Sequence, residues 1–382
     1  MIHFVTHEFA PFRGGGATYV REVATAAAHL GLRVRVIAPD YGRTIHPSDS
    51  TEPFPIVRVP GNGRLTPGGL WSLSRALARE RETLRDEPII LLSVGAQMAM
   101  MLLVRFAAFR PTRRPVAFFH GSEVFRFRDH PIWRRLASQS LPLTQPACAT
   151  AYVEDLLRRS SLYEDDATIV RAPCACPAAL VESASAGKFG RQPEVPSRPQ
   201  TFRLLTLARL HPRKGQHLTA QALGLLPAEV KQRLHYQIAG EGPPEYRRLV
   251  ERTCEAAGIA FDIRGAVAPH ELTEVYSACD AFVMTSVTLP NSVEGFGISY
   301  LEASIHGKPV IGFRTGGVSE AVLHDETGFL VPEGDVAGVA DAILRLERDP
   351  ALCHRLGQRG REYALSFRWE DAARVLCEAA SA

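Results

Sequence analysis

Residues 281–313 read AFVMTSVTLPNSVEGFGISYLEASIHGKPVIGF, and they contain two short apolar runs on either side of a helical pattern. Ala281–Met284 and Pro309–Phe313 have the length and composition of buried strands. Between them, a polar loop leads into a helix that we predict to begin near Gly297. Strands joined through a helix form a right-handed crossover, so this stretch predicts neighbouring strands of a parallel sheet.

The same alternation of strands and helices runs through both halves of the chain. In the first half the predicted strands are Ile2–Thr6, Arg33–Ala38, Ile56–Val59, Ile89–Ser93 and Val116–Phe119, and the predicted helices are Ala17–Leu30, Leu70–Arg85 and Ala96–Phe109. In the second half further strands are predicted at Phe202–Leu207, Leu234–Ala239 and Phe261–Arg264. The pattern predicts an α/β protein with two Rossmann-like, doubly wound parallel sheets.

The chain has 382 residues, more than one hydrophobic core usually supports, so two domains are expected. Between residues 182 and 200 the sequence is polar, rich in Pro, Ser and Gly, and without periodicity. We therefore expect an N-terminal domain at 1–182, a linker at 183–200 and a C-terminal domain at 201–368, with a last helix in 369–382 that is compatible with either domain. Two such domains leave a cleft between them, and parallel sheets bind ligands at their carboxyl edges.

The composition is that of a globular protein with a mild positive charge. A formal charge of +3 from dispersed basic residues does not favour a nucleic-acid-binding protein. Seven cysteines without regular spacing, and a strand-like start at MIHFVT, predict a reducing, cytoplasmic setting. Cys174 and Cys176 have no second Cys or His pair nearby, so a zinc site is the weaker interpretation. No apolar run reaches the ~20 residues that span a bilayer.

A glycine-rich loop, Phe12-Arg-Gly-Gly-Gly-Ala-Thr, separates the first strand from the first helix. Glycines allow close approach of a ligand, and free amides at a helix N-terminus favour a phosphate. A plain tight turn is an equally good interpretation. The loop is not G-x-G-x-x-G, and no acidic residue clearly fills the ribose position, which disfavours a nicotinamide site.

Basic residues follow the strand Phe202–Leu207. Arg209, Arg213 and Lys214 stand at its carboxyl end, before a helix. A guanidinium and an ammonium beside a helix N-terminus suit a diphosphate, although solvated basic loops are also common at such positions.

His120 ends the strand Val116–Phe119 in the sequence Phe-Phe-His-Gly-Ser-Glu. A lone histidine is most often a structural residue, but the carboxyl end of a strand is where a ligand would lie. Gly121 permits close approach, and Glu123 is a second polar candidate in this loop.

Two glutamates frame the helix in the opening stretch. Glu294 is predicted to lie in the loop, and Glu302 in the first turns of the helix. Glu294 and the amides of Gly295, Phe296 and Gly297 offer both acceptors and donors to a sugar. Glu302 is able to accept a ribose diol, or it is an ordinary glutamate favoured near a helix N-terminus.

These residues resemble the donor-binding signature of retaining GT-B glycosyltransferases of family 4. The resemblance rests on EGFGISYLEAS with GKPVIG downstream, followed by GGVSEAV and ETGFLV. ARLHPRKG, GEGP, HGSE and the glycine loop occur upstream in the expected order. The resemblance covers the chain from residue 1 to the last helix, and it implies the GT-B fold with two domains that face each other across a cleft.

The resemblance also implies roles for individual residues. It assigns Glu294 to the donor sugar, Glu302 to the nucleotide ribose, and His120 to the vicinity of the reacting sugar. The donor-binding set implied is Gly15, Gly16, Arg209, Lys214, Glu294, Gly295, Phe296, Gly297, Ile298 and Glu302, and the catalytic set is His120, Glu294, Arg209 and Lys214. Glu123 is the candidate for acceptor binding. The last helix is expected to cross back to the N-terminal domain.

The activity implied is transfer of a hexosyl group from a nucleotide diphosphate sugar to a hydroxyl group, with retention at the anomeric carbon. No carboxylate is an obvious nucleophile for a double displacement, so a same-face route is expected. The chain has no D-x-D triad, and basic side chains are able to replace a metal at the diphosphate. We therefore expect no metal and no cofactor.

Several points stay open at the level of sequence. The donor is GDP-mannose, a UDP-hexose or UDP-N-acetylglucosamine, and the segment TLPNSVEGFGISYLEAS is similar to mannosyltransferases. The acceptor is undefined. Aromatic and arginine residues in 105–114 and 124–135 suggest a lipid-linked acceptor and peripheral contact with a membrane. Buried aromatic rings with solvated arginines are the better explanation of these two segments. The alternatives to an active enzyme are an inactive sugar-nucleotide-binding subunit and, with less support, a dinucleotide-dependent oxidoreductase.

Overall fold

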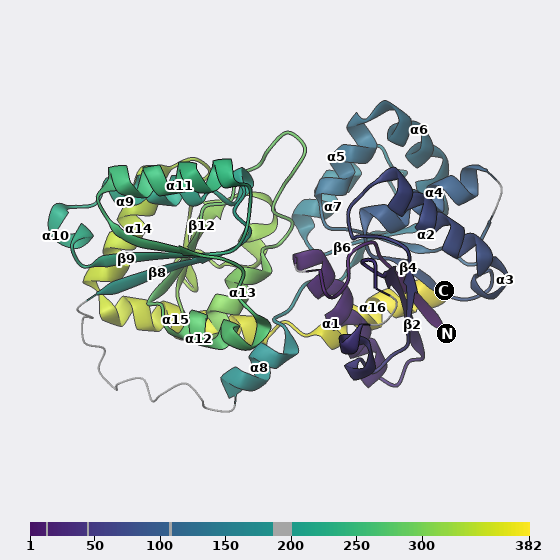
Figure 1. Cartoon of the computed structure of the whole chain (residues 1–382), viewed down its shortest axis with the longest axis horizontal. Helices are drawn as coiled ribbons and strands as arrows, with labels where there is room; N and C mark the ends of the chain where they lie inside the picture. Colours follow the sequence, from purple (N-terminus) through teal and green to yellow (C-terminus); the bar gives the residue numbers. More distant parts are fainter. Residues whose placement is uncertain (13, 44–45, 107–108, 186–200) are drawn as a thin grey trace. The chain divides into compact units, whose positions relative to one another are not determined.

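The computed structural model describes residues 1–12, 14–43, 46–106, 109–185 and 201–382, which form two compact units (Figure 1). The first unit contains residues 1–174 and 368–382, and the second contains residues 175–367. The expected linker falls largely on 186–200, outside the described residues. The first unit ends at residue 174 rather than 182, because α8 (Ala178–Ser185) packs against α12 (Leu272–Ser277) and α13 (Ile298–Ile305) of the second unit.

The first unit is built on a parallel sheet of seven strands in the order β3-β2-β1-β4-β5-β6-β7. The strands are β1 (Ile2–Val5), β2 (Val34–Pro39), β3 (Ile56–Val59), β4 (Ile89–Leu91), β5 (Val116–Phe119), β6 (Gln145–Cys148) and β7 (Val170–Arg171). The central strands β1, β4 and β5 are buried along their whole length because helices cover both faces of the sheet.

The helices of the first unit lie in two layers. On one face, α1 (Gly15–His29) packs against α16 (Trp369–Ser381). The crossovers that run in the other direction place α2 (Pro67–Arg79), α4 (Val94–Arg105) and α6 (Pro131–Ser140) on the opposite face, where they pack in that order. The remaining elements are α3 (Arg81–Leu84), α5 (Ser122–Asp129), α7 (Ala151–Arg158) and the 3-10 turns η1 (Pro47–Thr51) and η2 (Leu141–Leu143).

The second unit repeats this plan with a parallel sheet of six strands in the order β10-β9-β8-β11-β12-β13. The strands are β8 (Phe202–Leu207), β9 (Leu234–Ala239), β10 (Ala260–Arg264), β11 (Ala281–Met284), β12 (Val310–Arg314) and β13 (Gly328–Pro332). One face carries α9 (Gln216–Gly224), α11 (Pro244–Ala257) and α14 (Val336–Arg348), and the other carries α12, α13 and α15 (Pro350–Leu365). The short elements are α10 (Ala228–Lys231), η3 (Pro212–Lys214), η4 (Pro269–Glu271) and η5 (Gly316–Glu320).

The predicted α/β fold with two parallel, doubly wound sheets is confirmed. All ten predicted strands are present, with ends that differ by at most two residues. The sequence did not predict β6, β7 and β13. β6 begins with a glutamine and a proline, β7 has only two residues, and β13 has a glycine and a proline at its ends, so none of them shows a long apolar run.

The last helix, α16, packs within the first unit, although it follows the second unit in sequence. Its Trp369 is buried, and the indole ring lies edge-on to Tyr19 of α1 with ring centroids 5.3 Å apart. The hydroxyl of Tyr19 donates a hydrogen bond to the carbonyl oxygen of Ala172 at 2.9 Å. The first unit therefore needs both ends of the chain for its core.

The substitution Trp369→Ala is expected to destabilise the first unit by about 3–5 kcal/mol, because it removes a buried aromatic ring and leaves a cavity. Urea unfolding monitored by circular dichroism measures this loss. Arg374→Ala, on the exposed side of the same helix, is the control and should change the free energy of unfolding by less than about 0.5 kcal/mol. Equal losses for the two variants would contradict the packing of α16.

Candidate functional site

The strand order of the second sheet places the loops after β8 and β11 side by side. From β8 the chain continues to β9 on one side, whereas β11 leads to β12 on the other. The two connections therefore leave the sheet in opposite directions and open a crevice at the carboxyl ends of β8 and β11. The two loops are residues 208–215 and 285–297, which carry most of the predicted donor-binding residues.

Gly215 joins these two loops. Its backbone has φ of +70°, and a Cβ atom there would lie 1.9 Å from the carbonyl oxygen of Thr285. The hydroxyl of Thr285 donates to the carbonyl oxygen of Gly215 at 2.6 Å, and the amide of Val287 donates to that of Arg213 at 2.8 Å. The requirement for glycine thus comes from the close approach of two backbones.

Glu294 is the centre of a buried cluster of charges. Its Oε2 atom accepts hydrogen bonds from Nζ of Lys214 at 2.6 Å, from Nη1 of Arg213 at 2.7 Å and from the hydroxyl of Ser286 at 3.1 Å. The Glu294 side chain is 9% exposed, and those of Arg213 and Lys214 are 12% and 14% exposed. All three contacts use one oxygen, so Oε1 is the oxygen that is left for a ligand hydroxyl.

The charges in this cluster are strongly coupled. Burial alone would raise the pKa of Glu294, but the positive charges of Lys214 and Arg213 outweigh burial and hold that pKa at about 2. Burial lowers the pKa of Lys214, while Glu294 opposes the change. Two cations and one carboxylate leave one positive charge without a partner inside the cluster, which favours an anionic ligand.

Gly316 and Gly317 hold the backbone of Glu294. The amide of Gly317 donates to the carbonyl oxygen of Glu294 at 2.9 Å. Gly316 has φ of +52°, and a Cβ atom on it would lie 2.1 Å from the same oxygen. No role was predicted for these glycines beyond their place in GGVSEAV, because only the fold brings η5 against the loop after β11.

The residues that follow Glu294 lead into α13. The ring of Phe296 is buried and lies edge-on to Phe367, with ring centroids 5.7 Å apart. Gly297 has φ of +89° and is the residue before the helix, which begins at Ile298, one residue later than predicted. The turn is fixed from within the unit, since the hydroxyl of Tyr300 donates to the carbonyl oxygen of Met284 at the end of β11.

Glu302 lies apart from the cluster, on α13. Its carboxylate accepts a hydrogen bond from the hydroxyl of Tyr276 at 2.6 Å. Burial, and then the charge of Glu302, raise the pKa of Tyr276 well above its ordinary value, so the phenol stays a donor. The two glutamates are therefore held by different partners.

Arg209 and Arg213 have different surroundings. Arg209 is exposed, and its carbonyl oxygen accepts a hydrogen bond from Nε2 of Gln216 at 3.0 Å. Arg213, to which the family resemblance gave no role, is the arginine that contacts Glu294. The sequence signal for Arg213 was the basic loop itself, but the spacing could not show which side chain turns inward.

The first unit has its own crevice position between β1 and β4, where the strand order reverses. Gly15 and Gly16 are the first residues of α1, so their amides lie at its N-terminus. A Cβ atom on Gly16 would lie 2.9 Å from Oε2 of Glu8 and 4.0 Å from Nε2 of His120. His120 also contacts the carbonyl oxygen of Leu92 through Nε2 at 3.0 Å.

His7 and Glu8, which follow β1, were not predicted as site residues. Nε2 of His7 lies 3.6 Å from Oε1 of Glu8, and the imidazole packs on Gly95, where a Cβ atom would lie 2.6 Å from the ring. Burial, with smaller contributions from His120 and Arg126, lowers the pKa of His7 to about 4. Their position directly after β1 was the signal that could have identified them.

Glu123 is buried in the structure, and its Oε2 accepts a hydrogen bond from the amide of Gly121 at 2.9 Å. Gly121 precedes α5 and has φ of +124°. The carboxylate thus folds back onto the start of its own helix, and acceptor binding by Glu123 stays a prediction.

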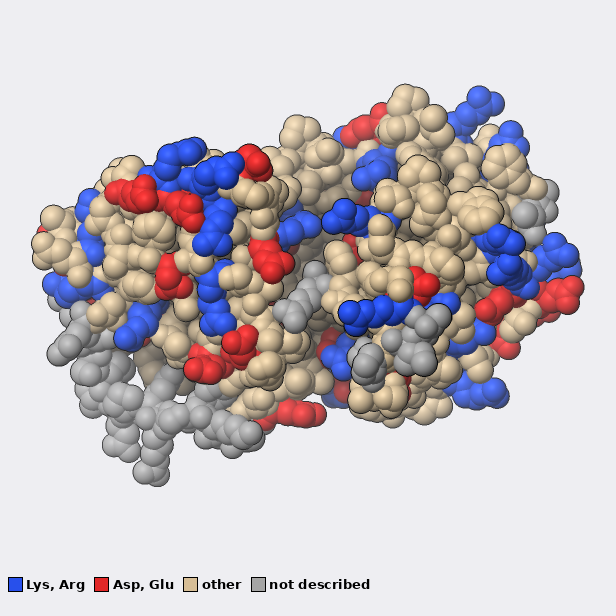
Figure 2. All heavy atoms as spheres, in the orientation of Figure 1, with Lys and Arg blue, Asp and Glu red and all other residues tan. Residues whose placement is uncertain are grey.

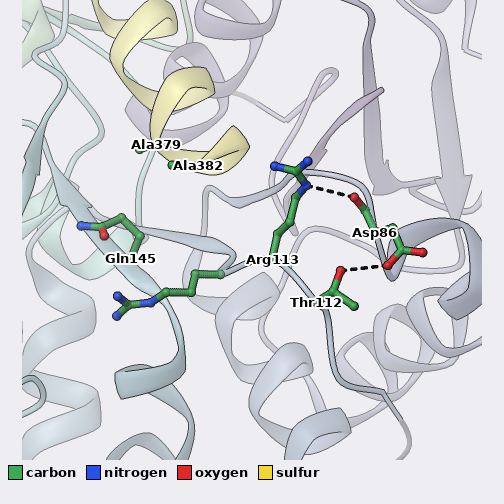
Figure 3. A pocket seen from close by; sticks show the side chains of 7 residues that line it. Asp86, Thr112, Arg113, Gln145, Ala379 and Ala382 are labelled. Atoms are coloured by element: carbon green, nitrogen blue, oxygen red, sulfur yellow. Dashed lines mark hydrogen bonds between the residues drawn. The ribbon is translucent and has the colours of Figure 1, made fainter.

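A cavity of about 710 Å³ lies at the amino edge of the first sheet, opposite the edge that carries the loops after β1 and β5. Figure 3 shows Thr112 and Arg113 bonded to Asp86 beside the end of α16. Arg114, which also lines this cavity, donates to the carbonyl oxygens of Pro142 and Thr144. Both arginines thus donate to backbone carbonyl oxygens and hold neighbouring segments together. We therefore do not consider this cavity the candidate site.

Within the described ranges, no three or more His, Cys, Asp or Glu side chains are grouped so that they could hold a metal ion. Cys174 and Cys176 are both buried. Neither unit thus offers a metal centre among the residues that the structure describes.

Two family profiles match the chain. The profile described as Glycosyltransferase Family 4 matches residues 13–170, and the one described as Glycosyl transferases group 1 matches residues 191–363. Together they cover both units.

Curated relatives match over nearly the full length. A "GDP-mannose-dependent alpha-(1-6)-phosphatidylinositol monomannoside mannosyltransferase" from Mycolicibacterium smegmatis is 30% identical, with 98% of this chain and 96% of the relative covered. The protein of the same description from Mycobacterium tuberculosis is 29% identical with the same coverage.

Solved structures share the fold. Sucrose-phosphate synthase from Thermosynechococcus elongatus has a TM-score of 0.76 and 22% identity, with 98% of this chain and 96% of that chain covered. WaaG, "a glycosyltransferase involved in lipopolysaccharide biosynthesis", has a TM-score of 0.68 and 16% identity, with 100% and 98% covered. The predicted GT-B fold is thereby confirmed.

The substitution Gly316→Ala is expected to destabilise the second unit by about 2–3 kcal/mol more than Gly334→Ala does. Both glycines have positive φ, but only at Gly316 would the new methyl group meet a backbone atom, while Gly334 has open space around it. Urea unfolding of the two variants compares the losses. Similar losses would show that the contact with Glu294 imposes no constraint.

The depressed pKa of Glu294 predicts a dependence of stability on pH. Its contribution is complete above the ordinary pKa of 4.5 and is lost as the pH falls toward about 2, at about 1.4 kcal/mol per pH unit. Free energies of unfolding measured at several pH values in this window should fall more steeply for the wild type than for Glu294→Gln.

The control for this measurement is Glu245→Gln. The Glu245 side chain is exposed, and its contact with Arg248 is long, at 3.7 Å, and open to water. Its pH profile should follow that of the wild type. Parallel profiles for the wild type and Glu294→Gln would contradict the coupling within the cluster.

Proposed function

The chain belongs to glycosyltransferase family 4 and has the GT-B fold, and on this premise we propose that it transfers a hexosyl group from a nucleotide diphosphate sugar to an acceptor hydroxyl with retention. The observation that carries the proposal is the buried cluster of Glu294, Arg213 and Lys214 at the carboxyl edge of β8 and β11. Its uncompensated positive charge suits the diphosphate of the donor.

In the proposed complex, Lys214 and Arg213 stabilise the diphosphate as it leaves, and Arg209 adds a further positive charge from the edge of the same loop. Preorganised cations of this kind are most effective where water is excluded, as around the buried Glu294. Gly15 and Gly16 contribute amides at the N-terminus of α1.

Glu294 holds the donor sugar in this scheme and is not a nucleophile or a base. A carboxylate with a pKa of about 2 that already accepts three hydrogen bonds is a poor proton acceptor. Its Oε1 accepts a sugar hydroxyl, the amides that follow in Gly295–Ile298 line the same turn, and Glu302 accepts the hydroxyls of the ribose.

Transfer proceeds on one face of the sugar. The bond from the anomeric carbon to the diphosphate oxygen breaks, and the acceptor oxygen forms its bond to that carbon from the same side. The proton of the acceptor hydroxyl passes to the leaving diphosphate, so no protein base is required. His120 lies beside Gly16 in the first unit and is proposed to contact the reacting sugar.

GDP-mannose is the proposed donor, and a lipid with a phosphatidylinositol mannoside headgroup is the proposed class of acceptor. The support comes from the printed activity of relatives that match 98% of this chain. Those relatives are only 29–30% identical, so a panel of donors is the appropriate test.

We also propose that no divalent metal is needed. Where a metal would neutralise the diphosphate, this chain has Arg213 and Lys214 within one cluster and no D-x-D triad in its sequence. Among the described residues, no helix combines the length and apolarity needed to cross a bilayer.

A panel of GDP-mannose, UDP-glucose, UDP-N-acetylglucosamine and the free diphosphates tests the donor by thermal shift and by transfer to phosphatidylinositol mannoside. GDP-mannose should stabilise the wild type, and Lys214→Ala should lower kcat/KM by about 100- to 1000-fold through lost charge stabilisation. Arg252→Ala, an exposed basic residue on α11, is the control and should leave both unchanged. EDTA should not change the rate.

The same panel separates the alternatives. Failure of every nucleotide to stabilise the wild type would contradict the proposed function. Binding of a nucleotide sugar without transfer or hydrolysis would indicate an inactive binding subunit. A dinucleotide-dependent oxidoreductase would instead show an absorbance change on titration with NAD(P)H.

A further inference from the structure

One helical face of the first unit carries positive charges without negative ones. This basic helical face consists of α2, α4 and α6, which pack in that order over one side of the sheet. Its exposed arginines are Arg75, Arg79, Arg105, Arg134 and Arg135. No Asp or Glu occurs in residues 53–79, 88–122 or 130–153, which include all three helices.

Figure 2 shows basic atoms around α6 and beside α4, and the acidic atoms visible nearby lie over α5 and toward α3. A solvated helix surface usually mixes both signs of charge. The absence of carboxylates from three neighbouring helices therefore indicates a surface with one preferred kind of partner, an anionic one.

Large apolar side chains stand among these arginines. Trp71 on α2 is 61% exposed, Phe106 at the end of α4 is 73% exposed, and Ile132 on α6 is 66% exposed. The guanidinium of Arg75 lies over the indole of Trp71 at 5.1 Å from the ring centroid. Exposed tryptophan beside arginine suits the boundary between lipid headgroups and acyl chains, where one end of each side chain is apolar and the other is hydrated.

The second unit offers a direct contrast. Its helix α11 also exposes a large apolar residue, Leu249, but there the basic residues pair with acidic neighbours. Arg247 contacts Glu251 at 2.8 Å, and Arg248 contacts Glu245 at 3.7 Å. With two of its three arginines beside carboxylates, that helix mixes both signs of charge as a solvated surface usually does, which makes it a suitable internal control.

The structure also refines the sequence hint from residues 124–135. Phe125 and Phe127 are buried, so these aromatic rings belong to the core. The exposed apolar contacts come instead from Trp71, Phe106 and Ile132, of which Trp71 lay outside the two segments that suggested a membrane.

We propose that the basic helical face is a docking surface for an anionic lipid bilayer. The arginines pair with lipid phosphates, and Trp71, Phe106 and Ile132 enter the interface without crossing it. A nucleic acid would match the charge but would leave Ile132, which has no aromatic face for stacking, in contact with water. The inference rests on the proposed function only in that it gives a lipid-linked acceptor a place to be collected; binding itself requires no donor.

Flotation of the full chain with vesicles tests this surface in the absence of nucleotide. Vesicles of phosphatidylcholine with about 30% phosphatidylglycerol should bind the wild type, and pure phosphatidylcholine vesicles should not. The double variant Arg75→Ala/Arg79→Ala should weaken partitioning about 30-fold, because each arginine near an anionic surface contributes about fivefold. Trp71→Ser should weaken it without changing its dependence on salt.

The matched control is Arg248→Ala/Leu249→Ser on α11, which should bind like the wild type. Thermal unfolding of each variant establishes that the units remain folded. Equal binding to neutral and anionic vesicles, no binding to either, or equal losses in the α2 and α11 variants would overturn the proposal, as would capture of the chain from anionic vesicles by an equimolar single-stranded RNA.

The results of this experiment distinguish failure of the docking surface from failure of the proposed function. A chain that does not bind vesicles but transfers a hexose to a detergent-dispersed acceptor would refute the docking surface alone. A chain that binds anionic vesicles through Arg75 and Arg79 but is stabilised by no nucleotide sugar would refute the function alone.

Discussion

The site depends on one buried carboxylate that is shared by two cations. Removing charges from water is costly, and the mutual attraction of Glu294, Lys214 and Arg213 offsets that cost only because they meet at hydrogen-bonding distance. Replacing Glu294 with a neutral residue would leave two buried cations without a counter-charge. The trio still contains one more positive than negative charge, so the protein itself leaves room for an anion. A cluster built for stability alone would have no reason to carry that excess.

The backbone makes this cluster possible. Gly215 brings the loop after β8 onto the end of β11, and Gly316 brings η5 onto the carbonyl of Glu294. At both positions a methyl group would overlap a backbone oxygen, so neither constraint can be relieved by a change of rotamer. The strand order of the sheet places β8 beside β11. The glycines then allow the backbones of the loops to come into direct contact.

The fold was largely predictable from sequence because its strands are apolar and separated by amphipathic helices. Phe202–Leu207, Leu234–Ala239 and Ala281–Met284 have the predicted bounds. The residues of the cluster were harder to predict. Lys214 and Glu294 were identified, but Arg213 entered only as one of three basic residues in a loop, since its inward direction depends on η3 and on the hydrogen bond from Val287. His7 and Glu8 were missed because no short motif marks them, and only the packing of β1, α1 and β5 brings them near Gly16 and His120.

The two units carry different kinds of side chains at their surfaces and loop sites. The second unit presents a compact, charged, glycine-constrained loop site, whereas the first presents histidines near the start of α1 and an arginine-rich outer face.

Binding of a diphosphate at the Glu294 cluster is measured most directly by hydrogen–deuterium exchange of the chain with and without a saturating nucleoside diphosphate. With the diphosphate bound at the cluster, the amides in residues 209–215 and 293–298 should exchange more slowly. Unchanged exchange in both segments, with protection elsewhere in the second unit, would contradict binding at this cluster.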